Sequence, residues 1–127
     1  MSQNLTVTTL YAREQMAKAR AEGEALTTVL QMAFGNGGLD TDGSPMAPTG
    51  EEQKLENEIF RKDIDSYELD GVRVKYKCTL EELELAGENI NELALVDEEG
   101  NFTALRRMGN KFKDGDIEFV FEIDDIY

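Results

Sequence analysis

The segment Val72-Arg-Val-Lys-Tyr-Lys-Cys-Thr-Leu80 has the clearest periodicity in the chain, because its apolar side chains alternate strictly with polar ones. A period of two residues is typical of a β-strand with one buried face and one face toward solvent. The end of the chain repeats this pattern and predicts a second strand of the same kind. There Ile117, Phe119, Phe121 and Ile123 face one way, and Glu118, Val120, Glu122 and Asp124 face the other.

Further strands are predicted on both sides of this stretch. Two apolar runs, residues 90–96 and 102–108, flank Asp97-Glu-Glu-Gly-Asn101, and a glycine-containing connection of this length is typical of a hairpin. Residues 25–34 are rich in β-branched and apolar side chains and stop at Gly35-Asn-Gly-Gly38. This pattern predicts a strand that ends in a turn.

Two helices are also predicted. Residues 8–22 are rich in alanine and other good helix formers, and Gly23 stands where a helix commonly ends in a left-handed cap. The segment Thr49-Gly-Glu-Glu52 has the spacing of a capping box, and Leu55 and Ile59 form an apolar i, i+4 pair. A short second helix is therefore expected after residue 50.

Residues 35–50 contain five glycines and both prolines of the chain, which predicts an exposed, flexible loop. The loop is expected inside one fold, because the strand before it needs the later strands as partners. The expected class is α+β. We expect a single domain over residues 1–127, in which an N-terminal helix and a second short helix pack on a mainly antiparallel sheet.

The 127 residues carry 13 basic and 27 acidic side chains, a net charge of −14. Such a charge disfavours binding to nucleic acid and to anionic membranes, both of which require clustered Lys and Arg. No stretch approaches the ~18 apolar residues of a membrane-spanning helix, and the N-terminus does not resemble a secretory signal. We therefore expect a soluble protein that is made inside the cell and has neither a nucleic-acid nor a membrane partner.

Candidate chemistry is sparse. The chain has no histidine, so neither a Ser-His-Asp nor a Cys-His nucleophile can be built. A calcium-loop reading of Asp40-Thr-Asp-Gly-Ser44 with Glu51 fails because Pro45 stands where the turn requires glycine. Cys78 is expected in the core, with a reactive thiol as the alternative. No catalytic, cofactor-binding or metal-binding residue is assigned, no cofactor is expected, and the protein is predicted not to be an enzyme.

Three segments resemble the N-terminal domain of phage tail-collar fibre proteins. The first runs from Tyr11-Ala-Arg-Glu-Gln-Met-Ala-Lys-Ala-Arg-Ala-Glu-Gly23 through Leu30-Gln-Met-Ala-Phe-Gly-Asn-Gly-Gly38. The second, Leu55-Glu-Asn-Glu-Ile-Phe-Arg61, is similar to a Leu-x-Asn-Glu-x-x-Arg element of that family. The third, Ile90-Asn-Glu-Leu-Ala-Leu-Val-Asp-Glu-Glu-Gly-Asn-Phe102, resembles its hairpin, in which a Glu precedes an apolar strand and an acidic-glycine turn.

The resemblance implies a structural component of a phage or prophage tail that attaches to the baseplate or forms part of the tail-fibre assembly. Baseplate or tail proteins are the implied partners, and a trimer is the implied oligomer. The implied location is the bacterial cytoplasm during assembly and then the virion tail. Such domains are often followed by a fibre shaft and a receptor-binding tip, so a chain that stops at Tyr127 is not expected to recognise a receptor.

The sequence assigns no partner-binding residues, but it suggests two hypotheses for how a partner could bind. The 35–50 loop could order on a neighbour, or the final strand could pair at a sheet edge. An alternative function class is an acidic inhibitor or immunity protein, in which the charge of −14 complements a basic partner. That class predicts tight, salt-sensitive binding to one basic protein, whereas a tail module should bind with weaker salt dependence.

Overall fold

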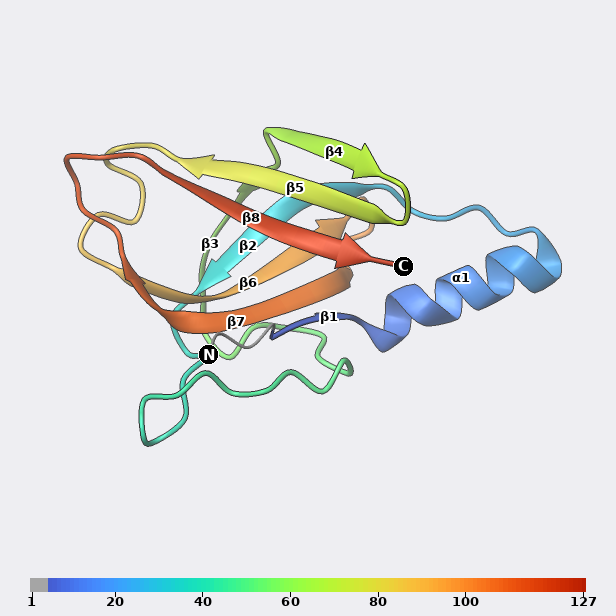
Figure 1. Ribbon diagram of the computed structural model, residues 1–127, viewed down its shortest axis with the longest axis horizontal. Helices are drawn as coiled ribbons and strands as arrows, with labels where there is room; N and C mark the ends of the chain where they lie inside the picture. The colour runs from blue at the N-terminus through green and yellow to red at the C-terminus, as the bar shows by residue number, and fades with distance from the viewer. Residues whose placement is uncertain (1–4) are drawn as a thin grey trace.

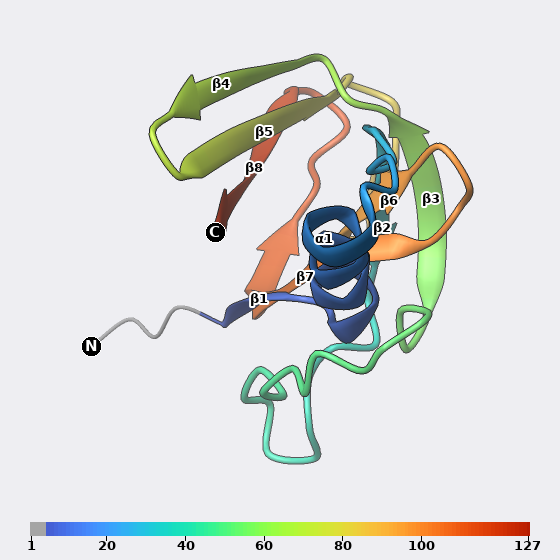
Figure 2. The same cartoon turned by 90° about the vertical axis from the view of Figure 1, so that its right-hand side faces the viewer.

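The computed structural model describes residues 5–127, which form eight strands and one helix. Two antiparallel sheets pack against each other as the layers of a sandwich (Figures 1 and 2). The elements in chain order are β1 (Thr6–Thr8), α1 (Leu10–Glu22), β2 (Val29–Gly35), β3 (Glu58–Asp63), β4 (Ser66–Asp70), β5 (Arg73–Leu80), β6 (Asn89–Asp97), β7 (Phe102–Phe112) and β8 (Phe119–Ile126).

The larger sheet has the strand order β1-β7-β6-β2-β3, and the smaller sheet has the order β4-β5-β8. The chain passes from one sheet to the other between β3 and β4. There the Ile64 N–H still donates to Leu30 O of β2 at 3.0 Å, whereas the next N–H, that of Asp65, donates to Lys77 O of β5 at 2.9 Å. Consecutive residues therefore bond to different sheets, which forms a corner of the sandwich.

The main core lies between the two sheets, where the alternating strands place their apolar faces. The hairpin of β6 and β7 is confirmed, and the predicted inner faces of β5 and β8 are confirmed within the strands. Val72 and Ile117, the first residues of the two predicted faces, lie outside the strands and are exposed. Eleven buried residues form this core: Met32, Phe34, Cys78, Leu80, Ile90, Leu93, Leu95, Ala104, Met108, Phe121 and Ile123. The strand predicted for residues 25–34 is present but begins only at Val29.

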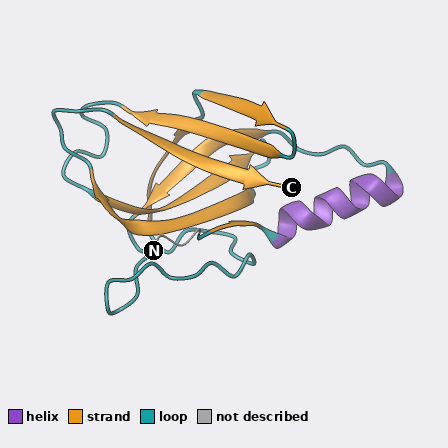
Figure 3. Cartoon of the chain, in the orientation of Figure 1, coloured by secondary structure: helices purple, strands orange, loops and turns teal. Residues whose placement is uncertain are grey.

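The other face of the large sheet is buried as well. Residues 36–57 run across it as a long connection without a helix (Figure 3). Leu55 of this connection packs against a second apolar cluster that includes Ala33, Ala94, Val96, Phe102 and Leu105. Because both of its faces are covered, β6 is buried over residues 90–97. Such continuous burial explains its nearly unbroken apolar sequence.

The prediction of an α+β fold with two helices was wrong. The structure is 48% strand and 11% helical, and α1 is the one helix of residues 5–127, so the fold is β-rich. The capping contacts at Thr49 do form, since its N–H donates to Glu52 Oε2 at 2.9 Å. No helix follows because the next amides bond elsewhere: the N–H groups of Glu56 and Asn57 both donate to Glu92 of β6.

The N-terminal helix is confirmed, with Thr9 as its N-cap and Gly23 in the left-handed conformation at its C-terminal end (φ 73°). Its packing differs from the prediction. Ala12 is its one buried residue, and the helix projects past the edge of the sandwich instead of lying on a sheet (Figures 1 and 2). Alanine and charged residues share most of its surface, so it has little apolar area to bury.

Candidate functional site

The most constrained polar cluster lies where β6 passes beneath the 36–57 connection. Its centre is Glu92, a fully buried acid that lies between the core residues Ile90 and Leu93 of β6. The Glu92 carboxylate accepts three backbone N–H groups, from Gly37 at 3.1 Å, Glu56 at 3.0 Å and Asn57 at 2.9 Å. Both ends of the long connection are therefore fixed to one side chain.

The neighbouring Asn91 extends the same attachment. Its Oδ1 accepts the Gly38 N–H at 2.7 Å, and its Nδ2 donates to Asn36 O at 3.2 Å and to Asn110 Oδ1 at 2.9 Å. The pairing of β6 with β7 shifts register between Ile90 and Glu92, so Asn91 lies at an irregularity of the ladder. Such irregularities redirect side chains. Here the side chains of the successive residues Asn91 and Glu92 both bind the backbone of the 36–57 connection.

Arg107 of β7 supplies the positive charge of the cluster. Its side chain is 4% exposed and lies 3.8 Å from Glu92, 3.7 Å from Glu52 and 3.7 Å from Glu56. These separations are too long for good hydrogen bonds. Within residues 5–127, Arg107 Nε and Nη2 have no hydrogen-bond partner. We call Asn91, Glu92 and Arg107 together the loop clamp.

The glycine turn at the start of the long connection, residues 35–38, lies very close to the loop clamp. A Cβ on Gly35 would lie 2.5 Å from Glu92 Oε2, and one on Gly38 would lie 2.9 Å from Asn91 O. Both distances are shorter than side-chain atoms tolerate, so only glycine lets this turn approach the clamp. The glycine turn of the sequence thus serves a close backbone contact.

A second cluster fixes α1 to the β6–β7 hairpin. Asp97 Oδ2 accepts the hydroxyls of Tyr11 and Thr27, both at 2.7 Å, and its Oδ1 accepts the N–H groups of Glu99 and Asn101. Burial alone raises the pKa of Asp97, but these hydrogen bonds outweigh it and hold the pKa below its ordinary value. The helix is therefore anchored at its first turn, while its later turns extend away from the sheets.

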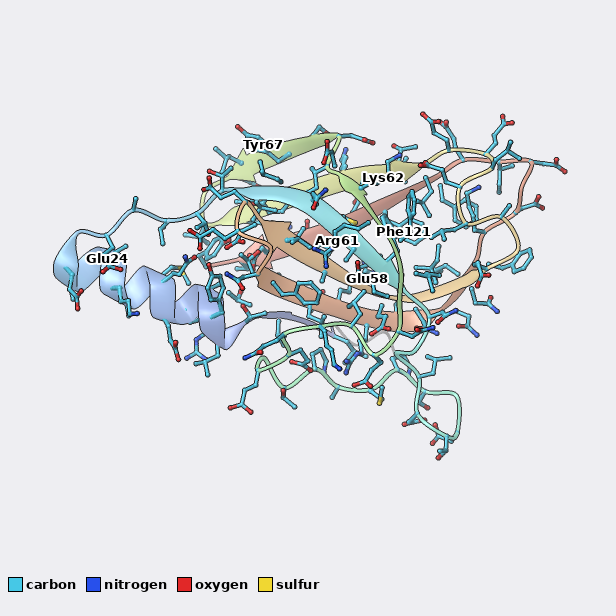
Figure 4. All side chains as sticks on the ribbon, turned by 180° about the vertical axis from the view of Figure 1, so that it is seen from behind. Glu24, Glu58, Arg61, Lys62, Tyr67 and Phe121 are labelled. Atoms are coloured by element: carbon cyan, nitrogen blue, oxygen red, sulfur yellow. The ribbon has the colours of Figure 1, made fainter. Side chains whose placement is uncertain are left out.

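The three segments that carry the family resemblance converge on the loop clamp. The glycine turn, the Glu56-Asn57 pair and the Asn91-Glu92 pair all meet there. Arg61, the last residue of the second segment, pairs with Glu58 at 2.8 Å and lies over the ring of Phe102 at 5.8 Å (Figure 4). Arg107 lies outside all three segments and was not predicted from the sequence, where it follows Arg106 in the apolar run of residues 102–108.

Comparison with known proteins agrees with this convergence. The family model described as "Phage tail-collar fibre protein, N-terminal" matches residues 1–118 of the chain. The chain belongs to this family. A search of curated proteins and a search of solved structures each found no match.

Membership in the tail-collar fibre family gives the chain a structural role in a phage tail, association with other tail components and a location in the virion tail. The matched range holds the loop clamp and ends just before β8 begins at Phe119. In residues 5–127 no helix is long and apolar enough to cross a membrane.

Two segments of this tail-collar fibre chain were predicted to contact a partner, the 35–50 loop and the final strand. The 35–50 loop is exposed at residues 40–44 but clamped at its start, and its flexibility stays a prediction. The final strand β8 does lie at a sheet edge. However, Arg106 Nη1 donates to Glu122 O at 2.7 Å there, so that edge is partly occupied. Pairing of β8 with a partner also stays a prediction.

Proposed function

We propose that this chain is a non-enzymatic structural domain, spanning residues 1–127, that attaches to the tail baseplate or forms part of the tail-fibre assembly. The observation that carries the proposal is the match to the tail-collar fibre family over residues 1–118. A fold alone does not specify a role, so the proposal depends on membership in a family of structural tail proteins and on the surfaces of this chain.

The geometry supports a rigid module with projecting contact surfaces. The loop clamp and the Asp97 cluster fix the long connection and the start of α1 to the large sheet. Beyond these anchors, most of α1 and the segment after it are exposed. Leu26 of that segment is 53% accessible, and Leu30 at the start of β2 is 50% accessible. Exposed apolar residues next to a fixed scaffold are suited to protein contacts within an assembly.

The finer features of the proposal follow the family resemblance. We propose a closed oligomer, a trimer by analogy, that assembles in the bacterial cytoplasm before incorporation into the virion tail. Light scattering behind size-exclusion chromatography, run at low and high salt, tests the oligomer. A trimer that survives high salt supports the proposal, and a monomer at both salt concentrations contradicts the trimer.

Deletion of the gene from the phage or prophage, complemented in trans by an epitope-tagged chain, tests the function itself. We expect particles without the chain to lack tail-fibre or baseplate density in electron micrographs, and the tagged chain to restore it and to be labelled at the tail. Complete tails that assemble and infect without the chain would contradict the proposal.

The alternative of an acidic inhibitor or immunity protein rests on the net charge of −14. Capture of partners by the tagged chain distinguishes the two classes. A single basic partner that dissociates when salt is raised from about 0.05 M to about 0.5 M favours the inhibitor, because exposed charge pairs are screened at that salt. Tail proteins that stay bound favour the structural role.

A further inference from the structure

Strand β4 is an open sheet edge. It pairs with β5 through five consecutive residue pairs, from Ser66↔Lys77 to Asp70↔Arg73, without a register shift. Its other edge pairs with no strand among residues 5–127, and all five of its residues are exposed. The backbone groups along an unpaired strand edge are a template for another strand.

Other edges of the sandwich are partly covered. At β8, Arg106 binds the Glu122 carbonyl, and the Thr8 hydroxyl of β1 donates to Asp125 Oδ1 at 2.6 Å. Strand β3 carries Lys62 (Figure 4), and its pairing with β2 shifts register between Phe34 and Gly35. Natural edge strands are commonly protected by Lys, Pro or a bulge. Strand β4 has none of these three.

The side chains of β4 form two rows of different chemistry. Tyr67 and Leu69 lie opposite Tyr76 and Val74 of β5 and share their face, yet they are 63% and 72% exposed. The other row is acidic, because Glu68 and Asp70 follow Ser66 on the opposite face, with side chains 68% and 82% exposed. The open edge thus presents an apolar row and an acidic row.

The strand that already pairs with β4 shows which sequence fits these rows. In β5, Arg73-Val-Lys-Tyr-Lys77 alternates basic with apolar residues, so Lys75 lies opposite Glu68 and Arg73 opposite Asp70. Opposite charges and apolar pairs facing each other across strands stabilise a sheet. A strand of the same pattern on the free edge would repeat these pairs.

We propose that β4 is a docking strand for an extended segment of another tail protein, in which Lys or Arg alternates with apolar residues. The inference rests on the proposed function and adds the chemistry of the partner. Backbone hydrogen bonds would provide affinity, while the two rows of β4 would select the sequence. A partner of this kind is also complementary to the net charge of −14.

A second copy of the chain fits this edge poorly. Antiparallel pairing of two β4 strands centred on Glu68 would place the two Glu68 carboxylates opposite each other, in a row that also holds Asp70. Like charges that face each other across strands are destabilising. The acidic row therefore favours a basic partner over self-pairing.

A peptide titration of the full chain tests the proposal. The probe is a capped peptide Arg-Val-Lys-Tyr-Lys, which copies β5, and the control peptide is Glu-Val-Glu-Tyr-Glu. We expect the basic peptide to bind and to slow amide hydrogen exchange at residues 66–70, and the acidic peptide to do neither. No binding of the basic peptide at millimolar concentration, or binding without protection of residues 66–70, overturns the proposal.

Two charge reversals sharpen the test. Glu68→Lys should weaken binding of the basic peptide about fivefold to tenfold, because an attractive cross-strand pair becomes repulsive. Glu24→Lys makes the same change in net charge beyond the end of α1, far from Tyr67 of β4 (Figure 4), and should change binding less than twofold. Equal weakening by both variants would show a non-specific charge effect and overturn the docking strand.

The remaining outcomes separate this inference from the proposed function. Protection of residues 66–70 that grows with chain concentration in the absence of peptide overturns the inference in favour of a second copy. Failure of the peptide experiments together with normal restoration of tails by the tagged chain overturns the docking strand alone. If deletion of the gene leaves complete, infectious tails, the proposed function is overturned, whatever the peptide result.

Discussion

The carboxylate of Glu92 lies 3.8 Å from Nε of Arg107, and both side chains are buried, at 0% and 4% exposure. This ion pair is the point at which the 36–57 connection, β6 and β7 meet. Removing one member of a buried pair is destabilising because the other buried charge loses compensation. Of the three carboxylates near Arg107, only that of Glu92 is fully buried. The fold of the long connection therefore depends on both charges.

Glu92→Gln is expected to lower the free energy of unfolding by about 3 kcal/mol. The amide retains one oxygen acceptor for the N–H groups of Gly37, Glu56 and Asn57. It removes the one fully buried carboxylate beside Arg107, which leaves that charge to the more exposed Glu52 and Glu56. Urea unfolding followed by circular dichroism measures the loss, and faster amide exchange at residues 36–57 should accompany it.

The matched control for this change is Glu51→Gln, which removes an exposed acid from the same connection. Surface substitutions of this kind usually change stability by less than about 0.5 kcal/mol. Equal stability of the two variants would show that the Glu92 carboxylate does not hold the connection.

Gly35→Ala tests the close approach of the glycine turn. A Cβ at this position would meet Glu92 Oε2 at 2.5 Å and Asn57 O at 2.7 Å, so the clamp must shift. We expect a loss of about 1–3 kcal/mol, the usual cost of overpacking. Gly109→Ala in β7 is the control, because its Cβ would meet nothing within 4 Å. A thermal unfolding midpoint lowered equally in both variants would contradict the close contact.

Strands with regular alternation could be predicted from the sequence, because a period of two fixes which face of a strand is buried. Strands β5 and β8 were predicted in this way, and the β6–β7 hairpin was predicted from two apolar runs on either side of a glycine-containing turn. Strands β1, β3 and β4 were missed. Their residues are exposed or half-buried, so their alternation carries little apolar signal, and their pairing is set by neighbours distant in sequence.

The second helix was mispredicted for a related reason. The capping contacts of Thr49 and Glu52 are local and do form, but the amides of Glu56 and Asn57 are taken by Glu92, 36 and 35 residues away. Glu92 is one acid among 27, so its residue type does not distinguish it from the exposed acids. The one available signal was the position of Glu92 directly before the apolar stretch 93–96.

The pKa values of the two buried aspartates, Asp97 and Asp125, are shifted in opposite directions. Hydrogen bonds outweigh burial and lower the pKa of Asp97, whereas burial raises the pKa of Asp125 above its ordinary value despite hydrogen bonds from Thr8 and Tyr127. Carboxyl carbon chemical shifts followed by NMR from pH 7 to pH 2 should show Asp125 protonating first. Protonation of Asp97 at the higher pH would contradict the geometry of both sites.

Stability should follow these directions. For Asp97, the pKa in the folded state lies below that in the unfolded state. The ionised carboxylate therefore adds to the free energy of unfolding above the ordinary pKa of 3.8, and this stabilisation is lost as pH falls through the folded-state pKa. For Asp125, ionisation at neutral pH opposes folding, and protonation relieves this as pH falls toward 3.8. The Asp125→Asn variant should therefore have a higher free energy of unfolding than the parent chain at pH 7. This difference in free energy should shrink at about pH 4, where Asp125 of the parent chain is protonated. A difference that is constant with pH would contradict the raised pKa.

Cys78 should be nearly inert toward thiol reagents in the folded chain. Its side chain is fully buried in the main core, which confirms its prediction as a core residue, and burial together with nearby Asp65 raises the pKa of the thiol to about 12. The thiolate is the reactive form, so at pH 8 the native chain should label with a disulfide reagent at least about 100-fold more slowly than in urea. Glutathione under the same two conditions controls for the effect of urea on the reagent. A native labelling rate within about tenfold of the glutathione rate would show instead that the sandwich opens readily at β5 and would favour the reactive-thiol alternative.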